Sequence, residues 1–245
     1  MKSLLAAIAF LTRIPVGRFA AIDEAGVASS SGWFPLVGVL LGAIFALAAA
    51  LLKDHLPLAV VAVLIVLLDS LLTGALHYDG LADTADGFGG GATREDILRI
   101  MRDHAIGSYG GVALIVVIAL KVTSYEALLR QANWIPAVIL TPALARWSVL
   151  LLTAALPYAR PSASPAEGMG KRTLIGGTVL MAAALTVATS MRAWAVAAVV
   201  VAVTACFGSY CRHRIAGMTG DTLGANVQLC ESAALLTFLW TGYQP

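Results

Sequence analysis

Long apolar stretches follow one another along the chain and are separated by polar breaks. The clearest, Trp33 to Leu52, has no charged residue and matches the ~20 residues that cross a hydrocarbon layer of ~30 Å. Together with helix breakers, these stretches predict about seven transmembrane helices, near residues 33–52, 56–76, 109–129, 133–157, 173–190, 193–211 and 223–242. A shorter apolar stretch at the N-terminus predicts an interfacial or re-entrant helix. We therefore expect an all-α, polytopic integral membrane bundle, with residues 1–245 forming a single domain.

Composition agrees with a membrane protein and narrows its partners. The chain has 245 residues, of which 59% are hydrophobic and 12% charged, whereas soluble domains have roughly 45–50% apolar residues. Because a water-soluble fold cannot bury that much apolar surface, the lipid bilayer is the expected partner. The net charge of +2 and the absence of a basic run with interleaved aromatic residues exclude nucleic acid. The sequence leaves open whether the protein forms a homo-oligomer.

The polar breaks are of two kinds. Short turns at residues 53–55, 130–132 and 191–192 alternate with longer polar loops, so all the long loops should lie on one side of the membrane. The short turns carry three basic residues, whereas the long loops carry ten, namely Arg13, Arg18, Arg94, Arg99, Arg102, Arg160, Lys171, Arg172, Arg212 and Arg214. Because basic residues are retained in the cytoplasm, we expect the long loops to be cytoplasmic.

A dense acidic motif runs from His77 to Gly87. On a helix, Asp79, Asp83 and Asp86 are four and three residues apart and share one face, where their charges repel one another. No basic residue lies within that turn to compensate them, and a hard divalent cation suits carboxylate oxygens. We expect Mg²⁺ because it binds through few carboxylates together with substrate phosphates. The alternative is a solvated loop with scattered acidic residues.

The segment after the acidic motif offers groups for phosphate oxygens. The run from Gly87 to Gly91 includes Gly89 and Gly90, whose N–H groups are candidates for a phosphate cradle, although the run is equally typical of a hinge. A helix is predicted to start at Thr93. On it, Arg94 and Arg102 are candidate phosphate contacts, with solvated surface as the alternative.

A second polar motif precedes the span at 109–129. Asp103 is expected to be a further metal ligand and catalytic residue, with Ser108 as a substrate contact. His104 is able to exchange protons near neutral pH or to orient a neighbour by hydrogen bonding.

Charged residues also occur inside apolar spans, where each unpaired charge costs at least ~2.5 kcal/mol and usually marks a functional pathway. They are Asp69, Lys121, Arg146 and Glu231. We expect Arg146 and Glu231 to contact substrate, Arg146 through phosphate. The alternative is charge pairing among these four residues.

The last motif lies before the final span. Asp221 is flanked by glycines, which permit close approach to a metal or phosphate, and it is expected to be catalytic and to lie near the acidic motif. Arg214 and Asn226 are the accompanying candidate substrate contacts. As a helix cap, Asp221 would need no substrate.

Five motifs in this order resemble the cobalamin synthase family, whose members are adenosylcobinamide-GDP ribazoletransferases. The motifs cover nearly the whole chain and are Phe10 to Pro15, Gly32 to Gly38, Asp79 to Asp86, Arg94 to Gly110, and Thr219 to Glu231. Ala216 departs from the pattern, which has a glycine ahead of Gly217.

The resemblance implies the last stage of cobalamin biosynthesis in the bacterial inner membrane. The ribose hydroxyl of α-ribazole, or of its 5′-phosphate, would attack the cobinamide-linked phosphate of adenosylcobinamide-GDP. That reaction expels GMP and gives adenosylcobalamin or its phosphate.

Two other functions compete with this one. Another membrane phosphotransferase would move a phospho-alcohol group from a nucleotide diphosphate to a lipid alcohol, also with an acidic helix and magnesium. A cation or metabolite transporter would instead place its acidic residues along a route through the membrane. Five of the candidate acids fall on the long-loop side, which disfavours transport, namely Asp79, Asp83, Asp86, Asp103 and Asp221.

Overall fold

The computed structural model describes residues 2–16, 24–160, 170–188 and 191–242. The described residues are almost entirely helical, with one isolated β-bridge between Tyr158 and Met218, which confirms the all-α prediction. Arg18, used above for the orientation, lies outside them. The helices are α1 (Lys2–Leu11), α2 (Glu24–Ser30), the 3-10 turn η2 (Ser31–Trp33), α3 (Phe34–Leu52), α4 (Leu58–Thr73), α5 (Leu76–Gly90), α6 (Arg94–Ile100), α7 (Ser108–Leu129), α8 (Ile135–Ala155), α9 (Lys171–Val187), α10 (Met191–Ile215) and α11 (Gly220–Gly242).

Fewer helices than expected are long and apolar enough to cross a membrane. Within the described residues, four qualify, namely the continuous stretch Gly26–Leu52, α7, α8 and α10, and α4 with α5 qualifies only as a pair bent by 91°. The protein is a polytopic membrane bundle, but the expected count of about seven spans is corrected to four or five. Helix α9 has only 17 residues. In α11, the buried polar residues Asn226, Gln228 and Glu231 lower the hydropathy of a helix in the centre of the bundle.

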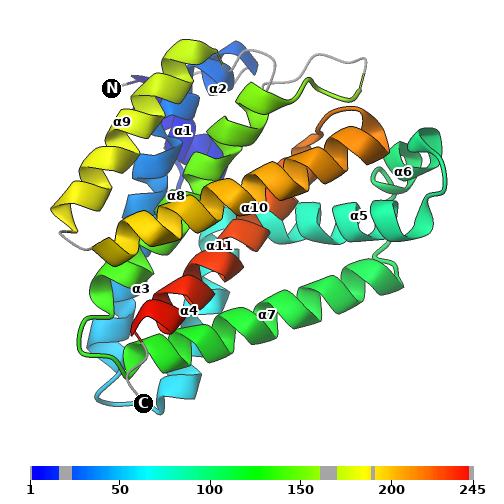
Figure 1. Cartoon of the computed structure of the whole chain (residues 1–245). Coiled ribbons are helices and arrows are strands. Elements are labelled where there is room, and N and C mark those ends of the chain that lie inside the picture. Colours follow the sequence, from blue (N-terminus) through cyan, green and yellow to red (C-terminus); the bar gives the residue numbers. More distant parts are fainter. Residues whose placement is uncertain (1, 17–23, 161–169, 189–190, 243–245) are drawn as a thin grey trace.

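Close helix contacts are made where side chains are small. Gly38 and Gly42 lie one turn apart on α3 and face the backbone of α8, where a Cβ on Gly42 would lie 2.5 Å from the Ile139 carbonyl oxygen. Small residues at this spacing let membrane helices approach closely. Figure 1 shows α11 running through the middle of the bundle between α7, α8 and α10.

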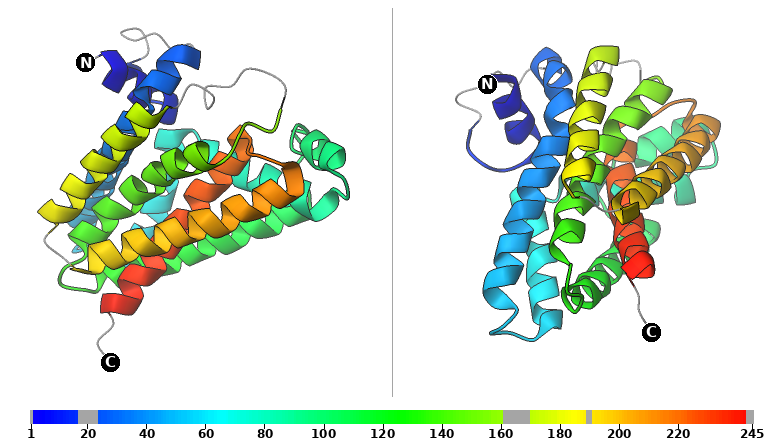
Figure 2. Two further views of the ribbon diagram at one scale, coloured as in Figure 1. Left: turned by 45° about the horizontal axis from the view of Figure 1, so that its top comes forward. Right: turned by 60° about the vertical axis from the view of Figure 1, so that its left-hand side comes forward.

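The connections between helices divide between two ends of the bundle. Figures 1 and 2 show the α3–α4 and α7–α8 turns at one end, close to the C-terminal end of α11. The other end carries α6 and the turn from α10 into α11, together with the far end of α5. The tertiary structure thus gathers the acidic motif and the last motif at the same end.

The bend between α4 and α5 is built by two residues with positive φ. Gly74 ends α4 at φ 62°, which costs glycine little, and Ala75 follows at φ 58°. The bend turns α5 away from the apolar α4. Asp79 on α5 is exposed and Asp83 partly exposed, and an exposed carboxylate is very costly in hydrocarbon. We therefore place helix α5 at the water-facing end of the bundle.

Candidate active site

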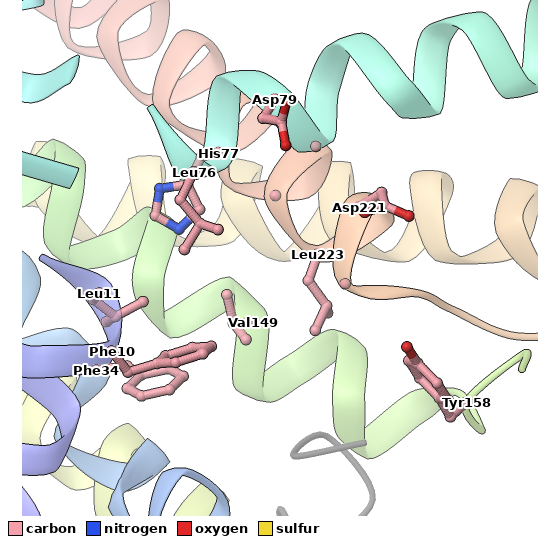
Figure 3. Close-up of a pocket in the computed structure, with 13 residues that line it drawn as sticks. Phe10, Leu11, Phe34, Leu76, His77, Asp79, Val149, Tyr158, Asp221 and Leu223 are labelled. Carbon is pink, nitrogen blue, oxygen red and sulfur yellow. The ribbon is translucent and has the colours of Figure 1, made fainter. Parts of the chain in front are cut away.

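A cavity of about 280 Å³ opens where α5 and the start of α11 face α1, α3 and α8. Asp79 and Asp221 lie on one side of it, and Phe10, Phe34 and Val149 form the opposite side (Figure 3). His77 and Tyr158 also line it. Asp79 and Asp221 are 142 positions apart in the sequence and meet here because their two helices cross. The expected proximity of Asp221 to the acidic motif is therefore confirmed.

The crossing of α5 and α11 depends on two glycines. Gly80 packs on the backbone of Asp221, so that a Cβ at position 80 would lie 2.7 Å from the Asp221 carbonyl oxygen. Gly224 faces Gly80 and His77 from the other helix, with its own Cβ position 3.3 Å from the Cα of each. Since these contacts are made by backbone, neither helix can yield by rotating a side chain. The glycines thus determine the distance between Asp221 and the acidic face of α5.

Asp79 in the cavity wall and Asp83, one turn further along α5, lack positive partners among the described residues. Neither the Asp79 nor the Asp83 carboxylate makes a hydrogen bond or ion pair with a described residue. Partial burial, and then the negative charges of Asp79, Asp221 and Asp86, raise the pKa of Asp83 to about 6, against a smaller opposing effect of His104. The excess negative charge is what a cation would relieve.

Asp221 has one positive partner. Its carboxylate forms an ion pair with Arg160 at 2.9 Å and accepts a hydrogen bond from the Thr219 hydroxyl. Burial nevertheless raises the pKa of Asp221 above its ordinary value, in spite of Arg160. Arg160 is held nearby by main-chain pairing, because Ala159 N–H donates to the Met218 carbonyl and Met218 N–H to the Pro157 carbonyl.

Asp86 is engaged differently from the other acidic residues. It is buried, and its two oxygens accept hydrogen bonds from the backbone N–H groups of Gly107 and Gly110, at 2.7 Å and 2.9 Å. Neither glycine position has room for a Cβ beside this carboxylate. Asp86 therefore caps the start of α7 from α5, where the helix dipole favours a negative charge. Metal ligation by Asp86 stays a prediction with less support than for Asp79 and Asp83.

The segment that Asp86 caps carries the second polar motif. Asp103, His104 and Ser108 are all exposed there. His104 is near enough to Asp83 to lower its pKa, whereas Asp103 accepts a hydrogen bond from the Ala105 N–H at 3.1 Å. Within the described residues, no group of three histidine, cysteine or acidic side chains is placed to hold a metal ion. Ligation by Asp103 and catalysis by His104 stay predictions.

The structure corrects the prediction that Gly89 and Gly90 form a phosphate cradle. Residues 87–90 form the last turn of α5, and the Gly91 N–H donates to the Gly87 carbonyl, so this segment is neither an open loop nor a hinge. Glycine is needed here for packing, because a Cβ on Gly89 would lie 2.5 Å from the Tyr109 ring. Gly89 and Gly90 therefore have no free loop amides to offer a phosphate.

Two of the candidate arginines tie elements of the site together. Arg94 donates to the carbonyls of Ala159 and Ile215, and Arg214 donates to the carbonyls of Phe88 and Gly91 at the end of α5. Arg102 is exposed and has no such bond within the described chain. Of the three, only Arg102 has a guanidinium without a described protein partner, and phosphate contact by Arg102 stays a prediction.

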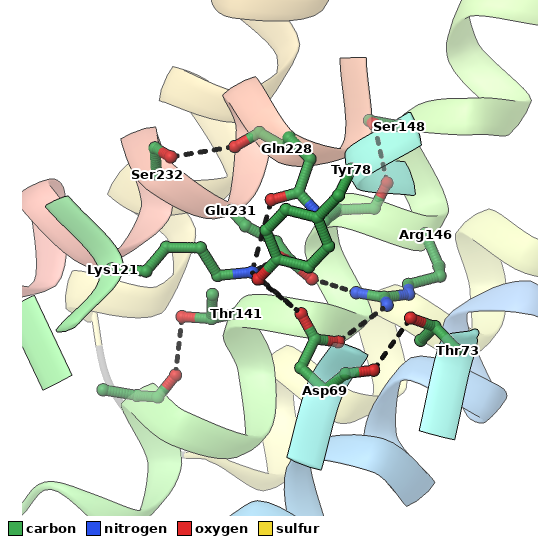
Figure 4. A network of polar contacts seen from close by, with 12 residues as sticks. Asp69, Thr73, Tyr78, Lys121, Thr141, Arg146, Ser148, Gln228, Glu231 and Ser232 are labelled. Atoms are coloured by element: carbon green, nitrogen blue, oxygen red, sulfur yellow. Dashed lines mark hydrogen bonds and ion pairs between the residues drawn. The ribbon is translucent and has the colours of Figure 1, made fainter. Parts of the chain in front are cut away.

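The four charged residues inside the spans pair with one another (Figure 4). Lys121 contacts Asp69 at 2.9 Å and Glu231 at 2.6 Å, and Arg146 contacts the same two carboxylates. Tyr78 also joins this network through Asp69 and Lys121. All four charges are buried, so charge pairing, the alternative stated above, is what the structure shows. The network joins α4, α7, α8 and α11 and gives no support to substrate contact by Arg146 or Glu231.

Asn226 is also in the interior. Its side-chain amide donates to the Ser148 hydroxyl at 2.8 Å and joins α11 to α8. Substrate binding by Asn226 stays a prediction without support from its position.

Several cavity residues were not among the candidates chosen from sequence. They are Phe10, Phe34, His77, Tyr158 and, beside Asp221, Arg160. His77 lies within the acidic motif but two residues from Asp79, and residues two apart do not share a helix face. Phe10 and Phe34 lie inside motifs of the family resemblance, which could have singled them out, whereas Tyr158 and Arg160 lie outside all five motifs and carried no such signal.

Comparisons with known proteins agree with this resemblance. The family model described as cobalamin-5-phosphate synthase matches residues 3–239. A protein of Ralstonia nicotianae named adenosylcobinamide-GDP ribazoletransferase is 40% identical, covering 98% of this chain and 96% of its own. A protein of the same name from Rhizobium etli (strain CIAT 652) is 37% identical, covering 94% and 93%. No solved structure matches. The chain therefore belongs to the cobalamin-5-phosphate synthase family.

Proposed function

We propose that this protein transfers the adenosylcobinamide-phosphate group from adenosylcobinamide-GDP to α-ribazole or its 5′-phosphate, with release of GMP. The observation that supports it most is the cavity that Asp79 and Asp221 line together at the polar end of a membrane bundle. Family membership over almost the whole chain supports the choice of substrates.

We propose that Mg²⁺ is the cofactor and that Asp79 and Asp83 hold it, with Asp221 facing them. Two carboxylates with no partner in the described part of the chain fit a cation that takes few protein ligands and completes its shell with water and phosphate oxygens. When bound, such an ion neutralises charge on the transferring phosphate.

The residues of the chain contribute positioning and proton transfer. Arg160, held beside Asp221 at 2.9 Å, is placed to balance diphosphate charge that arrives at the carboxylates. Asp83 or its neighbour His104 is placed to accept the proton of the attacking ribose hydroxyl. The glycine contact between α5 and α11 keeps these groups at a constant separation.

The test is GMP release by the purified protein given both substrates, with and without Mg²⁺. Asp83→Asn should nearly abolish turnover while the protein stays folded, because it removes a ligand from a partly exposed position. Asp54→Asn, in the exposed turn at the opposite end of the bundle, is the matched control and should keep wild-type turnover. Absence of GMP release by the wild type with both substrates would refute the proposed function.

We also propose that the site faces the cytoplasm, since ten basic residues lie in the long loops against three in the short turns. A reporter fused after Gly91 should then report a cytoplasmic location. A periplasmic signal from that fusion would reverse the orientation.

A further inference from the structure

The cavity has two chemically different ends. Its carboxylate end is described above, and its far end is apolar and aromatic, formed by Phe10, Leu11, Phe34 and Val149 (Figure 3). The rings of Phe10 and Phe34 stack on each other with centroids 5.9 Å apart and an interplanar angle of 14°. They come from α1 and α3 and close the cavity on the side away from Tyr158. This end suits a flat, uncharged, aromatic group.

His77 adds one polar group to the wall of this cavity. Its side chain is only 4% exposed, and its Nδ1 is buried without a hydrogen-bond partner in the described structure. Its Nε2 makes no hydrogen bond to a described residue either. Buried polar groups in proteins almost always have partners. Because Nδ1 has no accessible surface, Nε2 is the nitrogen of this cavity-lining residue to which a ligand atom can supply the missing partner.

The cavity is large enough for only one of the two substrates of the proposed reaction. Its volume of about 280 Å³ lies at the lower limit of the ~300–1,000 Å³ found for small-molecule sites. Adenosylcobinamide-GDP carries a corrin macrocycle, an adenosyl group and a guanine nucleotide, which together far exceed this space. α-Ribazole, a nucleoside with a benzimidazole base, is several times smaller.

We propose that the apolar end of this cavity binds the benzimidazole base of the acceptor nucleoside, with His77 hydrogen-bonded to a polar atom of that nucleoside. This inference rests on the proposed function. The base has apolar edges and faces that fit Phe10, Phe34 and Val149, and its ribose then extends toward Asp79 and Asp221. In this arrangement the acceptor hydroxyl reaches the carboxylates, and the larger donor approaches them from outside the cavity.

The test fills the apolar end without touching the carboxylates. Val149 is buried on α8 in the cavity wall, so Val149→Phe should block the base and raise the KM for α-ribazole about tenfold or more. The KM for adenosylcobinamide-GDP should stay at the wild-type value. Val63→Phe, on the exposed face of α4, makes the same change away from the cavity and should alter neither KM. If Val149→Phe does not fold, Val149→Leu should give a smaller shift in the same direction.

A substitution at His77 provides an independent test of the same subsite. His77→Phe keeps a ring but removes the hydrogen-bonding nitrogens, and it should weaken α-ribazole binding by about tenfold. Equilibrium dialysis of α-ribazole against each folded variant, without the donor, measures this directly. Free benzimidazole should compete with α-ribazole for the wild type and bind less to Val149→Phe.

The outcomes separate this inference from the proposed function. If wild-type protein turns over but a folded Val149→Phe keeps the wild-type KM for α-ribazole, or raises the KM of the donor instead, the subsite is wrong. If the wild type releases no GMP, the proposed function is wrong. Binding of α-ribazole that Val149→Phe abolishes would still support the subsite in that case.

Discussion

The contact between α5 and α11 is tested by adding a single methyl group at Gly80. A Cβ there would lie 2.7 Å from the Asp221 carbonyl oxygen and 3.2 Å from the Cα atoms of Asp221 and Gly224. Ordinary Cβ contacts begin at 3.4 Å, so Gly80→Ala requires the helices to separate by about 0.7 Å, the difference between 3.4 and 2.7 Å. Both neighbours are backbone, so no side-chain rotation relieves the contact.

We expect Gly80→Ala to affect turnover much more than stability. Overpacking costs ~1–3 kcal/mol, and the better helix propensity of alanine returns up to ~1 kcal/mol, which leaves a modest net loss. Displacing a catalytic group by about 1 Å can cost about 100-fold in rate, so we expect GMP release to fall roughly 10- to 100-fold.

The assay compares GMP release and thermal unfolding in detergent for Gly80→Ala and a matched control. Gly176→Ala changes a helical glycine of α9 whose Cβ would meet nothing within 4 Å. It should keep full activity. If folded Gly80→Ala turns over as fast as Gly176→Ala, the separation of α5 and α11 does not control the site.

Three further predictions concern charge, backbone and pH. Lys121→Met leaves two buried carboxylates with one shared cation, Arg146, where they had two, and should lower the free energy of unfolding by ~3–5 kcal/mol. Lys53→Met at a surface pair should cost at most ~1 kcal/mol, and equal losses in the two variants would refute the role of the network. Ala216 is exposed at φ 56°, so Ala216→Gly should stabilise by ~0.5–1 kcal/mol in the same assay, and a loss of stability would contradict the strain. Because the raised pKa of Asp83 keeps it protonated below about pH 6, the apparent Mg²⁺ affinity should fall up to about tenfold per unit below that pH; an Asp83→Asn variant with the same pH dependence would exclude this carboxylate as its source.

The acidic face of α5 follows from sequence alone. Spacings of four and three residues place Asp79, Asp83 and Asp86 on one side of any helix, whatever surrounds it. The membrane character follows likewise from the length and polarity of the apolar stretches. Both are local properties, set by helix periodicity and by the cost of transferring side chains between water and lipid.

The partners of those residues were decided only by the tertiary structure. Asp86 shares the acidic face but accepts hydrogen bonds from the start of α7, and Arg214 satisfies carbonyls at the end of α5 instead of standing free. The sequence shows Lys121 and Arg146 as charged residues inside apolar stretches, where an unpaired charge is costly. It does not decide whether they contact substrate or pair with Asp69 and Glu231.

The aromatic end of the cavity could not be predicted from local sequence either. Phe10 and Val149 come from helices far apart in the sequence, and nothing in their local pattern distinguishes a cavity wall from a membrane-facing surface. Helix periodicity determines which side chains share a face of one helix. Which faces meet depends on close packing between helices, here at Gly80 and Gly224, and that is a property of the whole bundle.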